Sequence, residues 1–291
     1  MKRSAAKLSR RALVRNAGLA ASAGLLGLGQ EKSLYSQPQA TAGATGQPRV
    51  LALIGDRHHN ADYIRVSLDK VFKELNVSVD YTIEYDKISA NSLKGYNIFL
   101  VLREGQNWSG GYLGPDAASF YSKNLENAAD FHDGPTVPWM SEEQGAAIKD
   151  FVNAGNGLYA LHDSSDISHT CKNFRDVMGG VFNGHPALRP FRVSPTANKH
   201  PITDGITPFM VNDEQHYVIY DKDPKYVLLE AENTDGLTFQ TLGTKSISAW
   251  AYDYGKGRVV FTAVGHTNHA MWVPQYLEIQ KRSMQWLLKQ I

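Results

Sequence analysis

The sequence predicts an α/β protein, built on an open, mostly parallel β-sheet in three layers, with helices on both faces of the sheet. Two observations lead to this class. The composition is that of a globular chain, with 42% apolar and 20% charged residues. A short apolar run is followed by a segment with helical spacing, and this alternation recurs along the chain. In such sheets ligands bind beyond the carboxyl ends of the strands, so functional residues are expected there.

The first half of the chain supplies most of this alternation. Residues 49–55 form a short apolar run that ends in glycine, as in a buried parallel strand. Ile64, Leu68 and Val71 then recur at helical spacing within residues 62–75. The pattern predicts further strands and helices, with strands at residues 77–85, 97–102 and 157–161 and helices at residues 142–152 and 174–178.

The second half is richer in strands. The patterns predict strands at residues 226–230, 247–252 and 258–264, and a final helix over residues 275–288. Gly255-Lys256-Gly257 predicts a hairpin turn between the last two strands. No repeat and no linker rich in Gly, Ser or Pro divides the chain, so residues 45–291 are expected to form one domain.

Residues 1–44 are typical of an export signal and tail. A basic start precedes the uncharged residues 17–29, which are too short for the ~20 residues that span a bilayer. Residues 9–14 resemble a twin-arginine signal, and residues 40–44 offer small-x-small cleavage sites. An amphipathic or disordered tail is the alternative. We therefore expect a periplasmic or otherwise exported protein without a membrane span, and export of folded chains weakly favours a metal cofactor.

Charge and cysteine content exclude several functions. Residues 1–44 hold seven Lys or Arg and one Glu, which leaves 23 basic and 28 acidic residues in the remainder. A nucleic-acid partner is not expected for such a mildly acidic domain. The single cysteine, Cys171, rules out an intramolecular disulfide and a multi-thiolate zinc site. Any metal must therefore be bound by His, Asp and Glu, and no nucleotide cofactor is evident.

Histidine and acidic residues follow several predicted strands. Three of these strands end near a histidine, which weakens the simpler interpretation that each histidine caps or packs. The residues at the strand ends are Asp56 and His59, Glu104, His162 and Asp163, and His266. The pattern predicts that these side chains share one site at the carboxyl edge of the sheet.

Two further segments carry polar groups among glycine, proline and aromatic residues. Residues 179–186 contain His185, and residues 212–217 contain Asp213 and Glu214. Each taken alone is typical of a turn or a solvated loop. Residues 200–205 are best explained by turn chemistry and are left outside the predicted site.

Five ordered motifs resemble those of the ThuA-like (trehalose utilisation) family over about residues 49–290. They are GLYALH at residues 157–162, GGVFNGHP at 179–186, HPITDG at 200–205, Asp213-Glu214, and YGKGRV at 254–259 leading to Gly265-His266-Thr267. The resemblance implies a flavodoxin-like fold similar to class I glutamine amidotransferases. It also implies a role in sugar metabolism, including trehalose and oxidised 3-keto sugars, and leaves the reaction open.

Comparison with the amidotransferase fold also argues against a cysteine nucleophile in this chain. In those enzymes a nucleophilic cysteine occupies the sharp turn after a central strand. His162 takes that position here, His266 takes a position like that of the partner histidine, and Cys171 is expected on the following helix. Glutaminase chemistry is therefore disfavoured. Ser164 and Ser165 lack the Gly-x-Ser-x-Gly frame of a serine nucleophile.

Imidazoles and a carboxylate suit a divalent metal such as Zn²⁺, which needs three protein ligands and an open position for catalysis. The predicted metal ligands are His162, His185, Glu214 and His266, and three of these, His162, Glu214 and His266, are the predicted catalytic residues. The alternative is metal-free acid–base catalysis beside a carbonyl. Both mechanisms suit isomerisation, hydration or hydrolysis of a sugar or keto-sugar.

The predicted ligand is a small carbohydrate. The candidate binding residues are Asp56, His59, Glu104, Trp108, Asp163 and Asp213. Trp108 lies in a long segment that also holds Tyr112, Phe120, Tyr121, Phe131 and Trp139, whose rings would either stack on sugar faces or anchor the segment.

Two hypotheses follow from these residues. The first is an exported enzyme that acts on a sugar or keto-sugar. The second is a non-catalytic carbohydrate-binding or sensing module whose histidines only bind hydroxyl groups. The sequence leaves the oligomeric state open, a homo-oligomer included.

Overall fold

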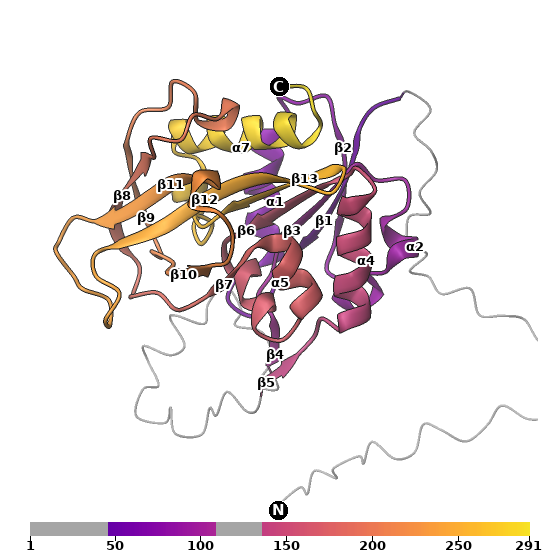
Figure 1. Ribbon diagram of the computed structural model, residues 1–291, viewed down its shortest axis with the longest axis horizontal. Helices are drawn as coiled ribbons and strands as arrows, with labels where there is room; N and C mark the ends of the chain where they lie inside the picture. Colours follow the sequence, from indigo (N-terminus) through magenta and orange to yellow (C-terminus); the bar gives the residue numbers. More distant parts are fainter. Residues whose placement is uncertain (1–45, 109–135) are drawn as a thin grey trace, which may run out of the picture. The chain divides into compact units, whose positions relative to one another are not determined.

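The computed structural model describes residues 46–108 and 136–291, which form a nine-stranded sheet in the order β2-β1-β3-β6-β13-β12-β11-β8-β9 (Figure 1). The first five strands in this order pair in parallel. They are β2 (Ser78–Thr82), β1 (Arg49–Ile54), β3 (Ile98–Leu102), β6 (Gly157–Leu161) and β13 (Gly257–Thr262). This half contains the predicted βαβ alternation.

The other half of the sheet is antiparallel and begins at β13. Its strands are β12 (Lys245–Tyr254), β11 (Val227–Asn233), β8 (Arg189–Pro195) and β9 (Phe209–Asp213). The β12–β13 hairpin turns at Gly255, whose φ of 58° is readily adopted by glycine, as predicted. Two small sheets pair β7 (Gly180–Phe182) with β10 (Val218–Tyr220) and β4 (Gln106–Trp108) with β5 (Thr136–Pro138).

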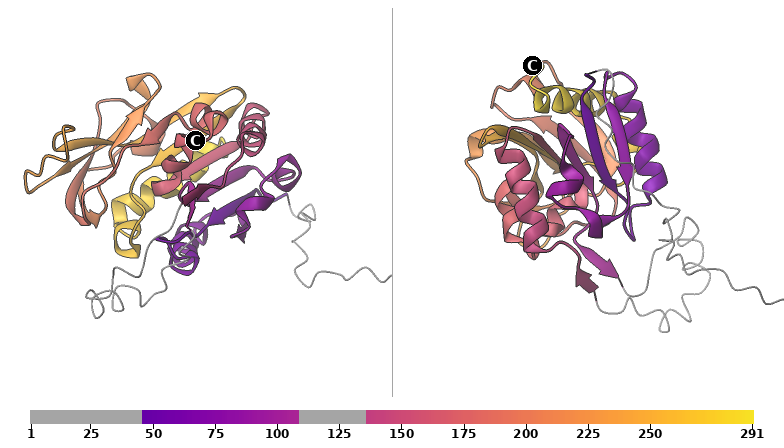
Figure 2. Two further views of the ribbon diagram at one scale, coloured as in Figure 1. Left: turned by 90° about the horizontal axis from the view of Figure 1, so that it is seen from below. Right: turned by 90° about the vertical axis from the view of Figure 1, so that its right-hand side faces the viewer.

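Helices cover both faces of the sheet (Figure 2). Successive strand side chains point to opposite faces, so each strand contributes to both cores. One core holds α1 (Ala61–Phe72), α6 (Asn268–Met271) and α7 (Pro274–Leu287). The other core holds α2 (Ala90–Leu93), α4 (Glu142–Asn153) and α5 (Lys172–Met178). Within the described ranges, 3-10 helices span Tyr85–Lys87, His162–His169, Pro201–Thr203 and Pro224–Tyr226.

Local chemistry fixes the ends of these helices. Asn60 caps α1 by accepting the N–H of Asp62, and Ser141 forms a capping box with Gln144 at the start of α4. α5 ends at Gly179, which has a left-handed φ of 89°. The predicted α/β class is confirmed, and the predicted helices and strands are present with ends shifted by three residues or fewer.

Some predictions concern residues outside the described part of the chain. The export signal at residues 1–44 and the rings of Tyr112, Phe120, Tyr121 and Phe131 lie there. Among the described residues, no helix has the length and apolar character needed to cross a bilayer.

Candidate functional site

The loop after β1 brings Asp56 and His59 to the carboxyl end of the sheet. Asp56 is buried and accepts the backbone N–H groups of His58 and His59, each at 2.8 Å, and that of Glu104 at 2.9 Å. Its Oδ1 also lies 2.8 Å from Nδ1 of His59. Burial would raise the pKa of Asp56, but His59 more than offsets this effect and the pKa is lowered. Asp56 thus positions the loop and the His59 ring.

His162 sits in the sharp turn directly after β6. It is fully buried and has a positive φ of 49°, a backbone angle that residues other than glycine rarely adopt. Its Nδ1 lies 2.6 Å from the carbonyl oxygen of Ala263, so Nδ1–H donates and Nε2 is the ring nitrogen that faces Glu214. A Cβ on Gly265 would lie only 2.6 Å from Cβ of His162, so this approach requires glycine.

Asp213 ends β9 and holds two neighbouring loops in place. It is fully buried and accepts the backbone N–H groups of Gly265 at 2.9 Å, His266 at 3.1 Å and Glu214 at 2.9 Å. Burial raises the pKa of the Asp213 carboxyl. The role of Asp213 as a substrate contact stays a prediction, and in the structure its carboxylate accepts backbone N–H groups and thereby positions Glu214 and His266.

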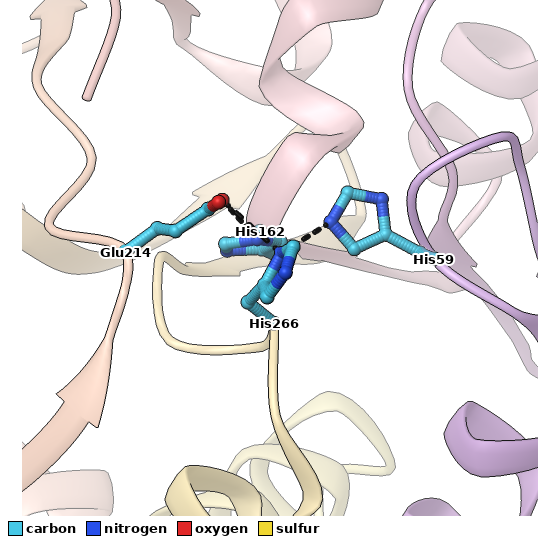
Figure 3. A group of neighbouring side chains, drawn as sticks. All are labelled: His59, His162, Glu214 and His266. Carbon is cyan, nitrogen blue, oxygen red and sulfur yellow. Dashed lines mark hydrogen bonds and ion pairs between the residues drawn. The ribbon is translucent and has the colours of Figure 1, made fainter. Parts of the chain in front are cut away.

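Glu214 Oε2 lies at the centre of the cluster. It is 3.1 Å from Nδ1 of His266 and 3.5 Å from Nε2 of His162 (Figure 3). It is also 3.6 Å from Nε2 of both His185 and His216. Burial would raise the pKa of Glu214, but His162 and its neighbours dominate and lower it below its usual range. Four imidazoles therefore surround one carboxylate, three of them from distant chain segments and His216 from the segment of Glu214 itself.

His59 and His266 pair with one another. Nε2 of His59 lies 3.0 Å from Nδ1 of His266 and 3.3 Å from Oδ2 of Asp163. Burial of His59 favours its neutral form, but the charges of Asp56 and Asp163 outweigh this and raise its pKa to about 10. Sequence analysis predicted His59 as a substrate-binding residue, and the structure brings its ring next to His162, Glu214 and His266 (Figure 3).

His216 belongs to the same cluster and was not singled out from the sequence. Its ring is buried and stacks on His162 with centroids 4.0 Å apart. Nε2 lies 3.1 Å from Oδ1 of Asp163. Burial and the nearby His162 lower the pKa of His216 to about 3. The one sequence signal was its spacing of two from Glu214, which places both side chains on one side of an extended segment.

His185 lies at the margin of the cluster. Its side chain is 31% exposed, and its Nδ1 lies 2.9 Å from the carbonyl oxygen of Pro186. Its Nε2 approaches Glu214, while its ring stacks on His216 with centroids 5.2 Å apart. His185 therefore lies beside Glu214 but belongs to neither compact set of ligand atoms described below.

Glu104 and Trp108 form a wall next to the loop after β1. The indole N–H of Trp108 donates to Oε1 of Glu104 at 2.8 Å, and the ring of Trp108 packs edge-on against His58. Burial and the charge of Asp56 raise the pKa of Glu104 to about 8. Trp139 is buried and donates to the carbonyl oxygen of Glu104 at 2.6 Å, so this ring anchors its segment.

Two overlapping groups of side chains offer donor atoms within 4.8 Å of one another in the described ranges. The first consists of His59, His162, Glu214 and His266, and the second of His162, Asp163, Glu214 and His216. Imidazole nitrogens and carboxylate oxygens are donors that Zn²⁺ and similar ions accept. The cluster can therefore hold a divalent cation or move protons between its groups.

Comparison with known proteins agrees with the motifs. The family model described as Trehalose utilisation matches residues 49–287. The chain belongs to the ThuA family. Among solved structures, a ThuA-like protein from Bacteroides uniformis is 16% identical with a TM-score of 0.56, covering 85% of this chain and 94% of the other. One from Parabacteroides merdae is 16% identical with a TM-score of 0.58, covering 83% and 90%. These identities bear on the fold alone. The comparison with curated proteins finds no match.

In this ThuA-family chain the single thiol lies away from the strand-end turn. Cys171 is the residue before α5 rather than within the helix, and it is fully buried. Its Sγ lies 3.5 Å from the carbonyl oxygen of Ser141 and packs against Gly145 of α4. Burial raises its pKa. These contacts tie the thiol to the helical layer.

Proposed function

We propose that this ThuA-family protein is an exported enzyme that acts on a sugar or keto-sugar by isomerisation, hydration or hydrolysis. The active site would be the cluster around Glu214. The observation that carries the proposal is the convergence of four imidazoles on Glu214 Oε2 at 3.1–3.6 Å, at the carboxyl edge of an α/β sheet. Family membership adds the carbohydrate context.

A divalent cation such as Zn²⁺ fits this donor set. Ligand atoms that surround Zn²⁺ tetrahedrally at 2.0–2.1 Å lie about 3.3 Å from one another. Glu214 Oε2 lies at 3.5 Å from His162 Nε2, and both atoms belong to each of the two donor groups. A bound cation would supply polarisation of a sugar carbonyl or activation of a water molecule.

The protein's own groups would then bind and orient the sugar and move protons. His266 Nδ1, 3.1 Å from Glu214 Oε2, is placed to exchange a proton with that carboxylate. Trp108 is half-buried, with the Arg57 guanidinium 5.0 Å from its ring centroid and Glu104 beside it, and this aromatic ring and carboxylate would suit the apolar face and hydroxyl groups of a sugar. Acid–base catalysis by the same groups without a cation is the alternative mechanism.

A keto-sugar screen with single substitutions tests the enzyme proposal. We expect His162→Ala and Glu214→Ala each to reduce turnover at least 100-fold, the order expected for loss of a general acid or base. His169→Ala, at an exposed histidine outside the donor groups, is the matched control and should retain activity. Activity that survives both cluster changes in folded protein would reject the assigned roles. Saturable sugar binding without turnover under any added metal would favour a binding or sensing module.

Export is the second part of the proposal. It is supported by the basic start, the Arg10-Arg11 pair and the short uncharged stretch that follows. Changing both residues to lysine should retain the full-length protein in the cytoplasm, while the natural chain should lose its N-terminal segment, as measured by fractionation and intact mass. Equal export of the two proteins would contradict a twin-arginine signal.

A further inference from the structure

We infer that the cluster binds one divalent first-row transition-metal ion through His162, Asp163, Glu214 and His216, and that His59 and His266 do not ligate it. This inference deepens the proposed function, on which it rests for the role of the cation. It differs from the sequence-based ligand set by including Asp163 and His216 in place of His185 and His266.

Unpartnered buried atoms distinguish this group from its neighbour. Over the described ranges, Nε2 of His162, Oδ1 of Asp163 and Nε2 of His216 are buried and make no hydrogen bond. His216 Nε2 lies 3.1 Å from Asp163 Oδ1, yet the two atoms are not directed as a hydrogen bond. Each buried polar atom without a partner costs about 1–3 kcal/mol, so three in contact indicate a missing shared partner.

The spacing of these atoms suits a single small cation. Asp163 Oδ1 is 3.9 Å from His162 Nε2, and Glu214 Oε2 is 3.5 Å from His162 Nε2 and 3.6 Å from His216 Nε2. With the 3.1 Å contact above, these separations bracket the roughly 3.3 Å between ligands in a tetrahedral zinc site. One ion can therefore satisfy all four donors at once.

The other donor group is already occupied by internal contacts. His59 Nε2 lies within hydrogen-bonding distance of His266 Nδ1, at 3.0 Å, and His59 Nδ1 contacts Asp56 at 2.8 Å. A cation bound there would have to replace these contacts. The same Nε2 of His59 also lies 3.3 Å from Oδ2 of Asp163, so the ring would orient this ligating carboxylate from outside the coordination sphere.

Charge balance points to the same group. Asp163 and Glu214 bring two negative charges, which match a divalent ion and reduce the cost of burying it. The first group contains one carboxylate, Glu214, with three imidazoles. The tautomer of His162, fixed by the Ala263 carbonyl, leaves Nε2 available as a ligand.

Pulsed EPR of the full-length protein loaded with Cu²⁺ tests the inference without any substitution, because it counts coordinated imidazoles. We expect two, from His162 and His216. Three imidazoles would overturn the inference and support the group that contains His59 and His266.

Zn²⁺ affinity, measured by competition with a chromophoric chelator, provides a second test. Asp163→Asn and His216→Gln should each weaken binding by more than about 100-fold, since loss of an outer contact alone weakens it 10- to 100-fold. His266→Gln removes only an outer contact to the ligating Glu214, so it is the comparison variant and should weaken binding by no more than about 100-fold. A larger loss in His266→Gln than in His216→Gln, with both variants folded by circular dichroism, would overturn the inference.

These outcomes separate the inference from the proposed function. Turnover of a keto-sugar by wild-type protein that binds neither Zn²⁺ nor Cu²⁺ would overturn the inferred metal site and would still support the proposed enzymatic function. Binding with two imidazoles but no turnover would support the inference and contradict the proposed enzyme.

Discussion

Tyr276 of α7 supports the strand that leads to His266, and removing its hydroxyl group should destabilise the protein measurably. The ring is fully buried, and its hydroxyl donates to the carbonyl oxygen of Val264 at 2.6 Å and lies 2.8 Å from Oγ1 of Thr262. Tyr276→Phe leaves the buried carbonyl without this donor. Leaving a buried group unsatisfied costs about 1–3 kcal/mol, which corresponds to a fall in Tm of about 2–10 °C for a domain of this size.

Tyr159→Phe is a matched control in the same core. Tyr159 is equally buried, but its hydroxyl lies 3.4 Å from Oγ1 of Thr262, a longer contact than either of those made by Tyr276. We expect it to lower the free energy of unfolding by less than about 1 kcal/mol, as measured by urea denaturation of both variants. If Tyr276→Phe were no more destabilising than Tyr159→Phe, the reasoning from hydrogen-bond geometry would be refuted.

Three further predictions concern other parts of the molecule. Gly265→Ala should cost about 1–3 kcal/mol in urea denaturation and weaken Zn²⁺ binding, because the new Cβ must displace His162; a variant unchanged in both would contradict the close packing. Burial and the nearby Arg258 lower the pKa of His200 to about 4. The contribution of the neutral ring to the free energy of unfolding is therefore complete above the usual pKa of 6.5 and is lost as the pH falls toward 4. Since the His200 ring is partly exposed, the free energy of unfolding of the wild type should fall only about 1–2 kcal/mol more than that of His200→Asn between pH 6.5 and 4. Curves of unfolding free energy against pH that run parallel for the two proteins would contradict this prediction. Cys171→Ala should retain turnover in a keto-sugar assay, and loss of activity in folded protein would restore a role for the thiol.

The parallel half of the sheet was readable from the sequence because its strands are continuous apolar runs. β1, β3 and β6 are buried at nearly every position, which gives them an unambiguous pattern. β8 and β9 were not delimited, since their alternating exposure and their charged or proline residues give a weak signal. β8 pairs with β11 and β9 pairs with β8, and no local sequence pattern records these long-range contacts.

The candidate site was predictable where a strand end fixed the position. His162 and His266 follow β6 and β13, and adjacent parallel strands bring them to one edge. His216 lies in an irregular segment after β9, so its approach to Asp163 depends on how that segment folds back. His185 was selected because it lies among glycine and proline residues, and the structure brings its Nε2 to 3.6 Å from Glu214 Oε2 while its Nδ1 faces the carbonyl oxygen of Pro186.

The inferred ligands come from residues 162–163 after β6 and residues 214–216 after β9, which lie on opposite sides of β13, the strand where the sheet changes from parallel to antiparallel. No fragment that lacks either half contains a complete set. A metal ion can consequently bind at the complete site only when both halves of the domain are folded. A bound ion would stabilise that domain by an amount that grows with the logarithm of its free concentration, so the stability of the folded protein would depend on metal supply.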